Sequence, residues 1–188
     1  DLGVMAFGSL NKDVDYQIGL FNGVGENIND TDKNDQKAVA GRFVVRPSFA
    51  KGLQLGASGA TAGFGSRADR PRRDRIGGEM LFVRRQFNVK AEYMQGIDGD
   101  THRRGYYTHF GYKISPKVEL VGRFDTFDPD VRSEDNVLNV TERDYIAGVN
   151  YYITENKVKL QFNYMRKTFA DAISPSRNVF MANLQTSW

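Results

Sequence analysis

Charged and apolar residues alternate along many short segments of this chain. From Lys157 to Tyr164 the residues run Lys-Val-Lys-Leu-Gln-Phe-Asn-Tyr, and the segment from Phe87 to Tyr93 alternates in the same way. Successive side chains of a β-strand point to opposite faces, so these segments predict strands with one apolar face and one polar face. We therefore expect an all-β chain.

The last segment, Asn178 to Trp188, also has a period of two. Phe180, Ala182 and Leu184 share one face, and a tryptophan is the final residue. An indole ring favours the boundary between a membrane and water, where its ring is buried and its N–H stays hydrated. This segment favours the closing strand of an outer-membrane β-barrel. An edge strand of a soluble sandwich is the alternative.

Composition limits the classes of protein that remain. The formal net charge of the 188 residues is +3, which does not indicate a nucleic-acid partner, and the absence of cysteine excludes a disulfide framework. No apolar run approaches the roughly 20 residues of a membrane-spanning helix. The mean hydropathy of −0.53 remains compatible with a β-barrel, because only alternate residues of each strand face lipid.

The alternation predicts about 11 strands, each near the length that a tilted strand needs to cross a bilayer. They are Gly3 to Leu10, Val14 to Leu20, Lys37 to Arg46, Leu53 to Gly63, Gly77 to Arg84, Phe87 to Gln95, Gly105 to Ile114, Lys117 to Thr126, Arg143 to Ile153, Lys157 to Arg166, and the last segment.

Short and long connections follow one another between these strands. The short ones are 11–13, 47–52, 85–86, 115–116 and 154–156, and the long ones are 22–36, 65–74, 96–104, 127–141 and 167–176. In an antiparallel meander, alternate connections lie at opposite ends. The pattern therefore predicts an antiparallel up-and-down transmembrane β-barrel with short periplasmic turns and long external loops.

Aromatic residues recur near the ends of the predicted strands. In a membrane barrel they would form girdles at the two interfaces, whereas in a soluble β-barrel or sandwich that binds ligands they would fill the core. The candidate girdle residues are Tyr93, Tyr106, Tyr112, Phe124, Tyr145, Tyr151, Tyr164, Phe180 and Trp188.

Several motifs, taken in order, resemble the phosphate-selective porin O/P family of Gram-negative bacteria, and the resemblance covers essentially the whole chain. The motifs are Tyr16 to Gly23, Arg42 to Pro47, Ala91 to Tyr93, Gly122 to Asp125, Phe127 to Pro129, and Gly148 to Tyr152.

The resemblance implies a sixteen-stranded barrel, usually a homotrimer, around a water-filled and anion-selective pore. Such a protein would lie in the bacterial outer membrane, in contact with lipid and lipopolysaccharide. With about 11 strands, residues 1–188 would be the C-terminal portion of a single transmembrane β-barrel domain. Unpaired backbone groups in hydrocarbon cost several kcal/mol each, so we expect the two edge strands to pair with N-terminal strands absent from this sequence.

The polar faces of the predicted strands carry the candidate pore-lining residues. Rings of arginine and lysine select anions, and the guanidinium fork matches phosphate oxygens. The alternative is a wall of mixed charge in which the basic and acidic side chains neutralise one another. The basic candidates are Arg42, Arg46, Lys90, Lys113, Arg123 and Lys159, and the acidic ones are Asp15, Glu79, Glu92, Glu119, Asp125 and Asp144.

The densest positive run falls on a predicted external loop and comprises Arg67, Arg70, Arg72, Arg73 and Arg75, which Arg103 and Arg104 on the next loop could join. These residues would draw anions to the mouth of a pore, or contact the sugars and phosphates of the outer leaflet.

Nothing in the sequence predicts catalysis, a cofactor or a metal. His102 falls on a predicted loop and His109 on a strand, and no serine is paired with either. The segment 30–34 begins like a calcium loop, but Asp35 and Gly41 occupy the positions of its glycine and its closing glutamate. We therefore expect a passive channel for small anions and not an enzyme.

Overall fold

The computed structural model describes residues 1–23, 37–63, 72–133, 140–154, 157–171 and 173–186. They form eleven β-strands, which confirms the predicted all-β fold. The strands are β1 (Gly3–Asn11), β2 (Val14–Phe21), β3 (Ala38–Val45), β4 (Leu53–Gly63), β5 (Arg72–Arg84), β6 (Phe87–Asp98), β7 (Thr101–Ser115), β8 (Val118–Asp128), β9 (Glu142–Thr154), β10 (Val158–Phe169) and β11 (Arg177–Thr186).

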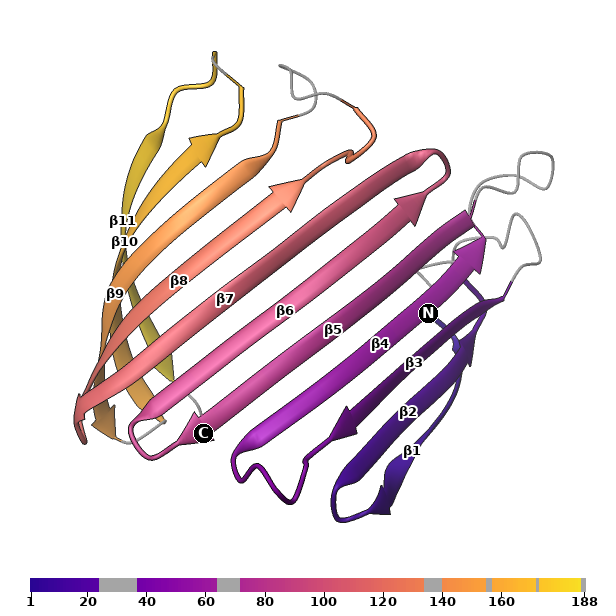
Figure 1. Cartoon of the computed structure of the whole chain (residues 1–188), viewed down its shortest axis with the longest axis horizontal. Coiled ribbons are helices and arrows are strands. Elements are labelled where there is room, and N and C mark those ends of the chain that lie inside the picture. Colours follow the sequence, from indigo (N-terminus) through magenta and orange to yellow (C-terminus); the bar gives the residue numbers. More distant parts are fainter. Residues whose placement is uncertain (24–36, 64–71, 134–139, 155–156, 172, 187–188) are drawn as a thin grey trace.

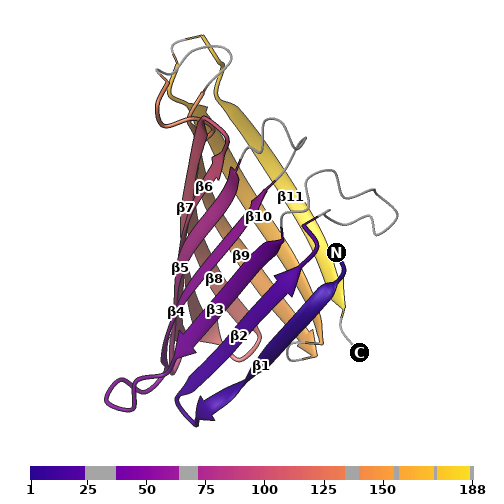
Figure 2. The same cartoon turned by 90° about the vertical axis from the view of Figure 1, so that its right-hand side faces the viewer.

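Each strand pairs antiparallel with the next one in the sequence, so the predicted up-and-down order is confirmed (Figure 1). The single sheet twists and curls into an open half-barrel (Figure 2). Within the described residues, β1 and β11 each pair along one edge only. Those residues contain no helix long and apolar enough to span a membrane.

The strand register assigns each side chain to a face. Glu79, Glu92, Tyr107, Asp125 and Asp144 are direct cross-strand partners in turn, so one polar row crosses β5 to β9 on a single face. Side chains converge on the concave face of a curled sheet. The most buried side chains are Val44, Glu119, Asn150 and Tyr152, and all four lie on this polar face, which is therefore the concave one.

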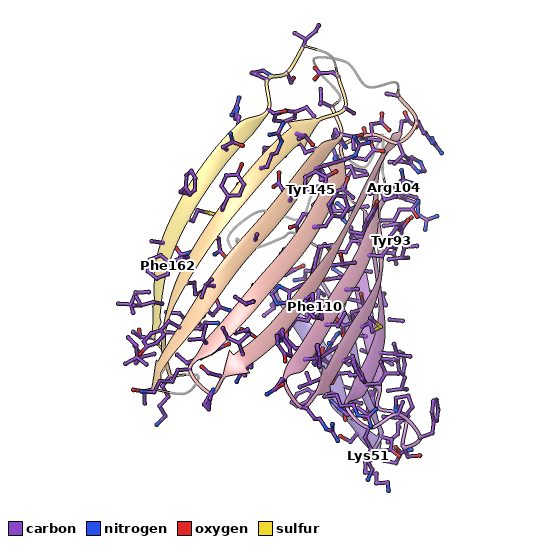
Figure 3. All side chains as sticks on the ribbon, turned by 60° about the vertical axis from the view of Figure 1, so that its left-hand side comes forward. Lys51, Tyr93, Arg104, Phe110, Tyr145 and Phe162 are labelled. Carbon is purple, nitrogen blue, oxygen red and sulfur yellow. The ribbon has the colours of Figure 1, made fainter. Side chains whose placement is uncertain are left out.

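The convex face is apolar and exposed. Leu120, Phe162 and Leu184 are 44%, 53% and 63% exposed, so they do not pack into a shared interior. Phe162 is labelled in Figure 3, together with Tyr93, Phe110 and Tyr145 of the same face. Among the described strand residues, charged side chains occur on this face only towards strand ends. They are Arg72, Asp74, Arg84, Arg104, Asp128, Arg143 and Arg166.

Aromatic rings gather in two zones of the convex face. Near the ends with long connections, the ring of Phe124 lies 6.0 Å from that of Tyr106 and 5.1 Å from that of Tyr145. Near the ends with short turns, Phe87 and Tyr112 are 4.7 Å apart. All the predicted girdle residues that the structure describes lie on this face, and Trp188 lies outside the described residues.

Two predicted loops are wrong in extent. β5 begins at Arg72 instead of Gly77, and the expected loop 96–104 is a two-residue turn between β6 and β7. Gly99 has a φ of 60°, which a tight hairpin of type II′ requires at its first central residue. The connections at that end of the sheet are therefore not all long.

Glycines of the concave face lie beneath long polar side chains. A Cβ atom on Gly96 would lie 3.0 Å from Nη1 of Arg75, and one on Gly56 or Gly148 would overlap Glu79 or Asn163. These glycines let the neighbouring polar side chains lie flat against the sheet.

Candidate functional site

The six predicted pore-lining cations lie on the concave face, and the three arginines among them are paired. Arg42 forms an ion pair with Glu79, and Nη1 of Arg46 lies 2.7 Å from Oδ2 of Asp15. Arg123 donates two hydrogen bonds to Asp125, one from Nε to Oδ2 at 2.8 Å and one from Nη2 to Oδ1 at 2.5 Å. Carboxylates on the same face therefore largely neutralise the charges of these three arginines.

The three lysines are different. Within the described residues, Lys90, Lys113 and Lys159 form no ion pair. The ammonium groups of Lys113 and Lys159 lie 4.8 and 5.9 Å from the ring centre of Tyr152. An aromatic ring attracts a cation but does not neutralise it, so Lys159 keeps its positive charge on the concave face. The charge of Lys113 is partly offset by Glu119, its direct cross-strand partner.

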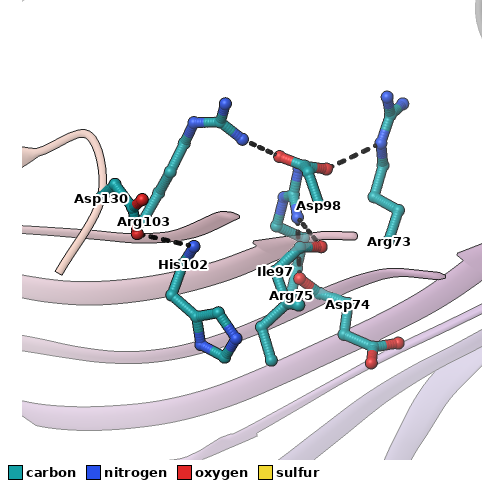
Figure 4. A network of polar contacts seen from close by, with 8 residues as sticks. All are labelled: Arg73, Asp74, Arg75, Ile97, Asp98, His102, Arg103 and Asp130. Carbon is teal, nitrogen blue, oxygen red and sulfur yellow. Dashed lines mark hydrogen bonds and ion pairs between the residues drawn. The ribbon is translucent and has the colours of Figure 1, made fainter. Parts of the chain in front are cut away.

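Three arginines surround one carboxylate where β5, β6 and β7 approach the tight turn (Figure 4). Asp98 accepts from Nε of Arg73 at 3.0 Å and from Nη2 of Arg75 at 2.7 Å, and it also pairs with Arg103. Asp98 is 16% exposed, whereas the arginines are between 41% and 52% exposed. This arginine cluster (Arg73, Arg75 and Arg103 around Asp98) holds more positive than negative charge.

The basic residues predicted to share a loop are divided by the structure. Arg72, Arg73 and Arg75 belong to β5, and Arg103 and Arg104 belong to β7. Alternation sends Arg72 to the convex face, where Nη2 lies 3.0 Å from Oδ2 of Asp74, and sends Arg73 and Arg75 to the concave face. Arg67 and Arg70 lie outside the described residues.

Glu119 forms a second network near the short-turn end of the concave face. It accepts from Nδ2 of Asn88 at 2.6 Å, from Nδ2 of Asn150 at 2.8 Å and from the hydroxyl of Tyr152 at 2.6 Å. Glu119 is 4% exposed, and the three side chains that donate hydrogen bonds to it are neutral. The sequence placed Glu119 among the acidic wall residues but did not predict these partners, which come from two other strands, β6 and β9.

The connection after β8 is tied to β7. The hydroxyl of Ser133 and the backbone N–H groups of Arg132 and His102 donate to Asp130, and together they hold the pKa of its carboxyl below its usual range. The backbone N–H of Val131 also donates to the carbonyl of His102 at 2.8 Å. These bonds fasten the connection beside the arginine cluster (Figure 4).

Neither histidine has the surroundings of a catalytic base. His102 lies in β7 and not in the predicted loop, and His109 lies on the concave face between Lys90 and Arg123. Three metal-ligating side chains do not come together anywhere in the described part of the chain. The segment 30–34 lies outside it.

The basic set of the concave face is larger than the acidic set. The basic side chains are Arg42, Arg46, Arg73, Arg75, Lys90, Arg103, Lys113, Arg123, Lys159, Lys167 and Arg177, and the acidic ones are Asp15, Glu79, Glu92, Asp98, Glu119, Asp125, Glu142 and Asp144. A charged concave face, an uncharged convex band and an antiparallel meander define the class of porin-like β-barrel walls.

Comparison with known proteins agrees with this class. The profile of the family described as phosphate-selective porin O and P matches residues 62–186, so the chain belongs to that family. Its members are channel proteins and not enzymes. A search of curated protein sequences gave no match.

Eight chains of known structure resemble this one. Among them is an anion-selective porin from Comamonas acidovorans, with a TM-score of 0.69 and 12% sequence identity. The match covers 97% of this chain and 54% of that porin, so the chain spans about half the length of that protein. At this identity the likeness concerns the fold alone.

Proposed function

We propose that this chain is part of the wall of a water-filled diffusion channel in a bacterial outer membrane, and that the channel prefers anions. The observation that carries the proposal is the division of charge between the two faces of one sheet. A band without charged side chains suits lipid, and a charged concave face suits water. The two zones of aromatic rings support the same orientation, because tyrosine favours membrane interfaces.

The preference for anions rests on the excess of basic over acidic side chains on the concave face. The arginine cluster places three guanidinium groups around one carboxylate, and Lys90 and Lys159 form no ion pair within the described residues. Such groups raise the local concentration of anions in a narrow aqueous passage. Phosphate is one candidate permeant because its oxygens match the guanidinium fork.

A closed barrel requires partners for both edges of the sheet that the described residues form. The free edges of β1 and β11 would leave backbone N–H and C=O groups without partners in hydrocarbon, which costs several kcal/mol for each group. We propose that further strands of a single barrel domain close the wall, with this chain as its C-terminal portion and its short turns on the periplasmic side. A homotrimer in contact with lipid and lipopolysaccharide follows the pattern of the family.

The test compares two neighbouring arginines in the full-length protein. Arg103→Glu changes the concave face, and the matched control Arg104→Glu changes the convex face one residue away. In planar bilayers under a potassium chloride gradient, we expect only the Arg103 variant to move the reversal potential towards cations. Equal shifts in both variants, or no single-channel conductance in the unmodified protein, would reject the proposal.

A further inference from the structure

A hollow of about 560 Å³ lies on the convex face, over β9, β10 and β11. The rings of Tyr164 and Phe180, with centroids 5.0 Å apart, border it, and the short side chains of Ala147 and Ala182 leave room beside them. We call the convex-face side chains that line this hollow the convex groove. They are Ala147, Val149, Phe162, Tyr164, Phe180 and Ala182.

Two exposed arginines follow the groove on the same face, towards the ends with long connections. Arg166 comes two residues after Tyr164 in β10, which places it about 7 Å further along the strand. Arg143 of β9 is the direct partner of Thr168, so Arg166 is its diagonal neighbour. Such neighbours lie about 7–8 Å apart, within reach of long side chains, so both guanidinium groups can contact one small group.

The charges of these two arginines are not compensated by the face that carries them. Arg143 and Arg166 form no ion pair within the described residues. Asp128 is the diagonal neighbour of Arg143 on β8, but its Oδ2 lies 3.5 Å from Nη2 of Arg104. Three arginines and one aspartate therefore leave two positive charges beside the groove.

The complement of this surface is a molecule with an anionic head and an apolar chain. Guanidinium groups match the oxygens of phosphate, and an apolar groove suits a hydrocarbon chain. Tyr145, the direct partner of Arg166, has a side chain that favours membrane interfaces, where lipid headgroups lie.

A second copy of this chain fits the surface less well. Among the described strand residues, the convex face carries only two carboxylates, Asp74 and Asp128, and each already pairs with an arginine of its own face. The convex face of a copy would therefore bring no free negative charge to Arg143 and Arg166.

We propose that Arg143, Arg166 and the convex groove form a binding site for a lipid with a phosphate headgroup in the outer leaflet. The phosphate lies between the two guanidinium groups, and an acyl chain lies in the groove. The proposal rests on the orientation of the two faces in the proposed function. It goes beyond that function because the site lies outside the water-filled passage.

The test counts lipids bound to the full-length protein by native mass spectrometry in an uncharged detergent. Dioleoylphosphatidic acid should bind about thirtyfold more tightly than dioleoylglycerol, which has the same chains without the phosphate. The double variant Arg143→Gln and Arg166→Gln should remove most of this difference. The matched control Arg84→Gln, on the same face at the opposite end of the sheet, should keep it.

A second pair of changes tests the groove. Ala147→Leu with Ala182→Leu fills it without adding charge, and should reduce the advantage of dioleoylphosphatidic acid over dihexanoylphosphatidic acid. An unchanged advantage would place the chain elsewhere and overturn the site. If filling the groove separates an oligomer into single subunits and leaves lipid binding unchanged, a second copy occupies the groove and the proposal is overturned.

Conductance of the unmodified protein in planar bilayers separates this proposal from the channel. Equal binding of phosphatidic acid and diacylglycerol, or equal losses in the Arg84 variant and the double variant, with normal conductance, would overturn the lipid site alone. A preserved lipid preference without conductance would reject the channel alone.

Discussion

Two carboxylates on the concave face, Asp98 and Glu119, are satisfied in opposite ways. Asp98 lies where β6 meets its tight turn and is surrounded by three half-exposed guanidinium groups. Glu119 lies towards the other end of the wall, is almost fully buried and accepts hydrogen bonds from two asparagines and a tyrosine. The arginines around Asp98 are also exposed to water, whereas Glu119 is enclosed by neutral hydrogen-bond donors.

In the proposed channel, this difference would separate groups that act on solutes from groups that stabilise the wall. A buried carboxylate with three short hydrogen bonds joins strands, and removing it leaves donors without partners. A partly exposed carboxylate among several arginines contributes little to stability, but it reduces the positive field of that region. Since both are acidic residues on a polar face, their exposure and partners distinguish them, not their residue type.

The largest expected effect is on stability. Glu119→Ala should lower the free energy of unfolding by about 3–5 kcal/mol, because the donors of Asn88, Asn150 and Tyr152 lose their acceptor in a buried site. Asp98→Ala, the matched variant, should cost about 1 kcal/mol or less. Urea unfolding of the full-length protein in detergent micelles measures both. Similar losses in the two variants would remove the distinction between these carboxylates.

A second change tests whether both carboxylates belong to a water-facing wall. Phe162→Arg places a charge in the middle of the convex band, where it should cost about 2–4 kcal/mol in a bilayer. Asn163→Arg places the same charge on the concave face one residue later and should cost much less. Unfolding in lipid vesicles provides the comparison. A greater loss from the Asn163 change would reverse the assignment of the two faces.

The third change affects selectivity and leaves the fold intact. Asp98→Asn removes one negative charge from the arginine cluster, so the ratio of chloride to potassium permeability should rise about two- to fourfold at low salt. Asp74→Asn, on the convex face of β5, should leave the ratio unchanged. Reversal potentials at 0.1 M and 1 M salt provide the measurement, and the effect should shrink at the higher concentration. A fall in the ratio would contradict our account of the arginine cluster.

The smallest change concerns the cation beside the Glu119 network. Lys113→Met should lower stability by about 0.5–1 kcal/mol, the usual magnitude of a contact between an ammonium group and an aromatic ring. A double-mutant cycle with Tyr152→Leu separates this contact from other effects of either change. A coupling energy of zero would show that Lys113 is held by its surroundings and not by the ring.

Much of the fold could be predicted from the sequence, because alternation fixes the face of a residue without knowledge of its partner. This holds for all six predicted pore-lining cations, from Arg42 to Lys159, which the structure places on one face. The register irregularities after Ser9, Lys113 and Val158 lie beside short turns, so they do not disturb the faces of the strand centres.

The arginine cluster could not be predicted in the same way. The run Arg72-Arg73-Asp74-Arg75 contains no apolar residue, so its alternation has no visible hydrophobic period until Ile76. The segment from Gly96 to Arg104 contains Gly96, Asp98, Gly99 and Asp100, which are residues typical of loops. Only the register of β5 and β6 brings Arg73 and Asp98 together.

The ion pairs of the concave face could be predicted from the sequence only in part. Arg123 and Asp125 are two residues apart in one strand, so their proximity follows from alternation alone. Arg42 and Glu79 come from strands that are not adjacent, and their ion pair depends on a side chain crossing the intervening strand above Gly56. Such diagonal contacts require the three-dimensional register.

The glycines beneath Glu79, Arg75 and Asn163 would also influence the bore of the proposed channel. Because these side chains rest against bare backbone, they lie along the wall instead of projecting towards the axis. Replacing Gly56 or Gly96 by alanine would lift one polar side chain away from the sheet, and in the proposed channel this would narrow the passage without altering its charge. The calibre and the electrostatics of the passage are therefore encoded by different residues and can vary independently.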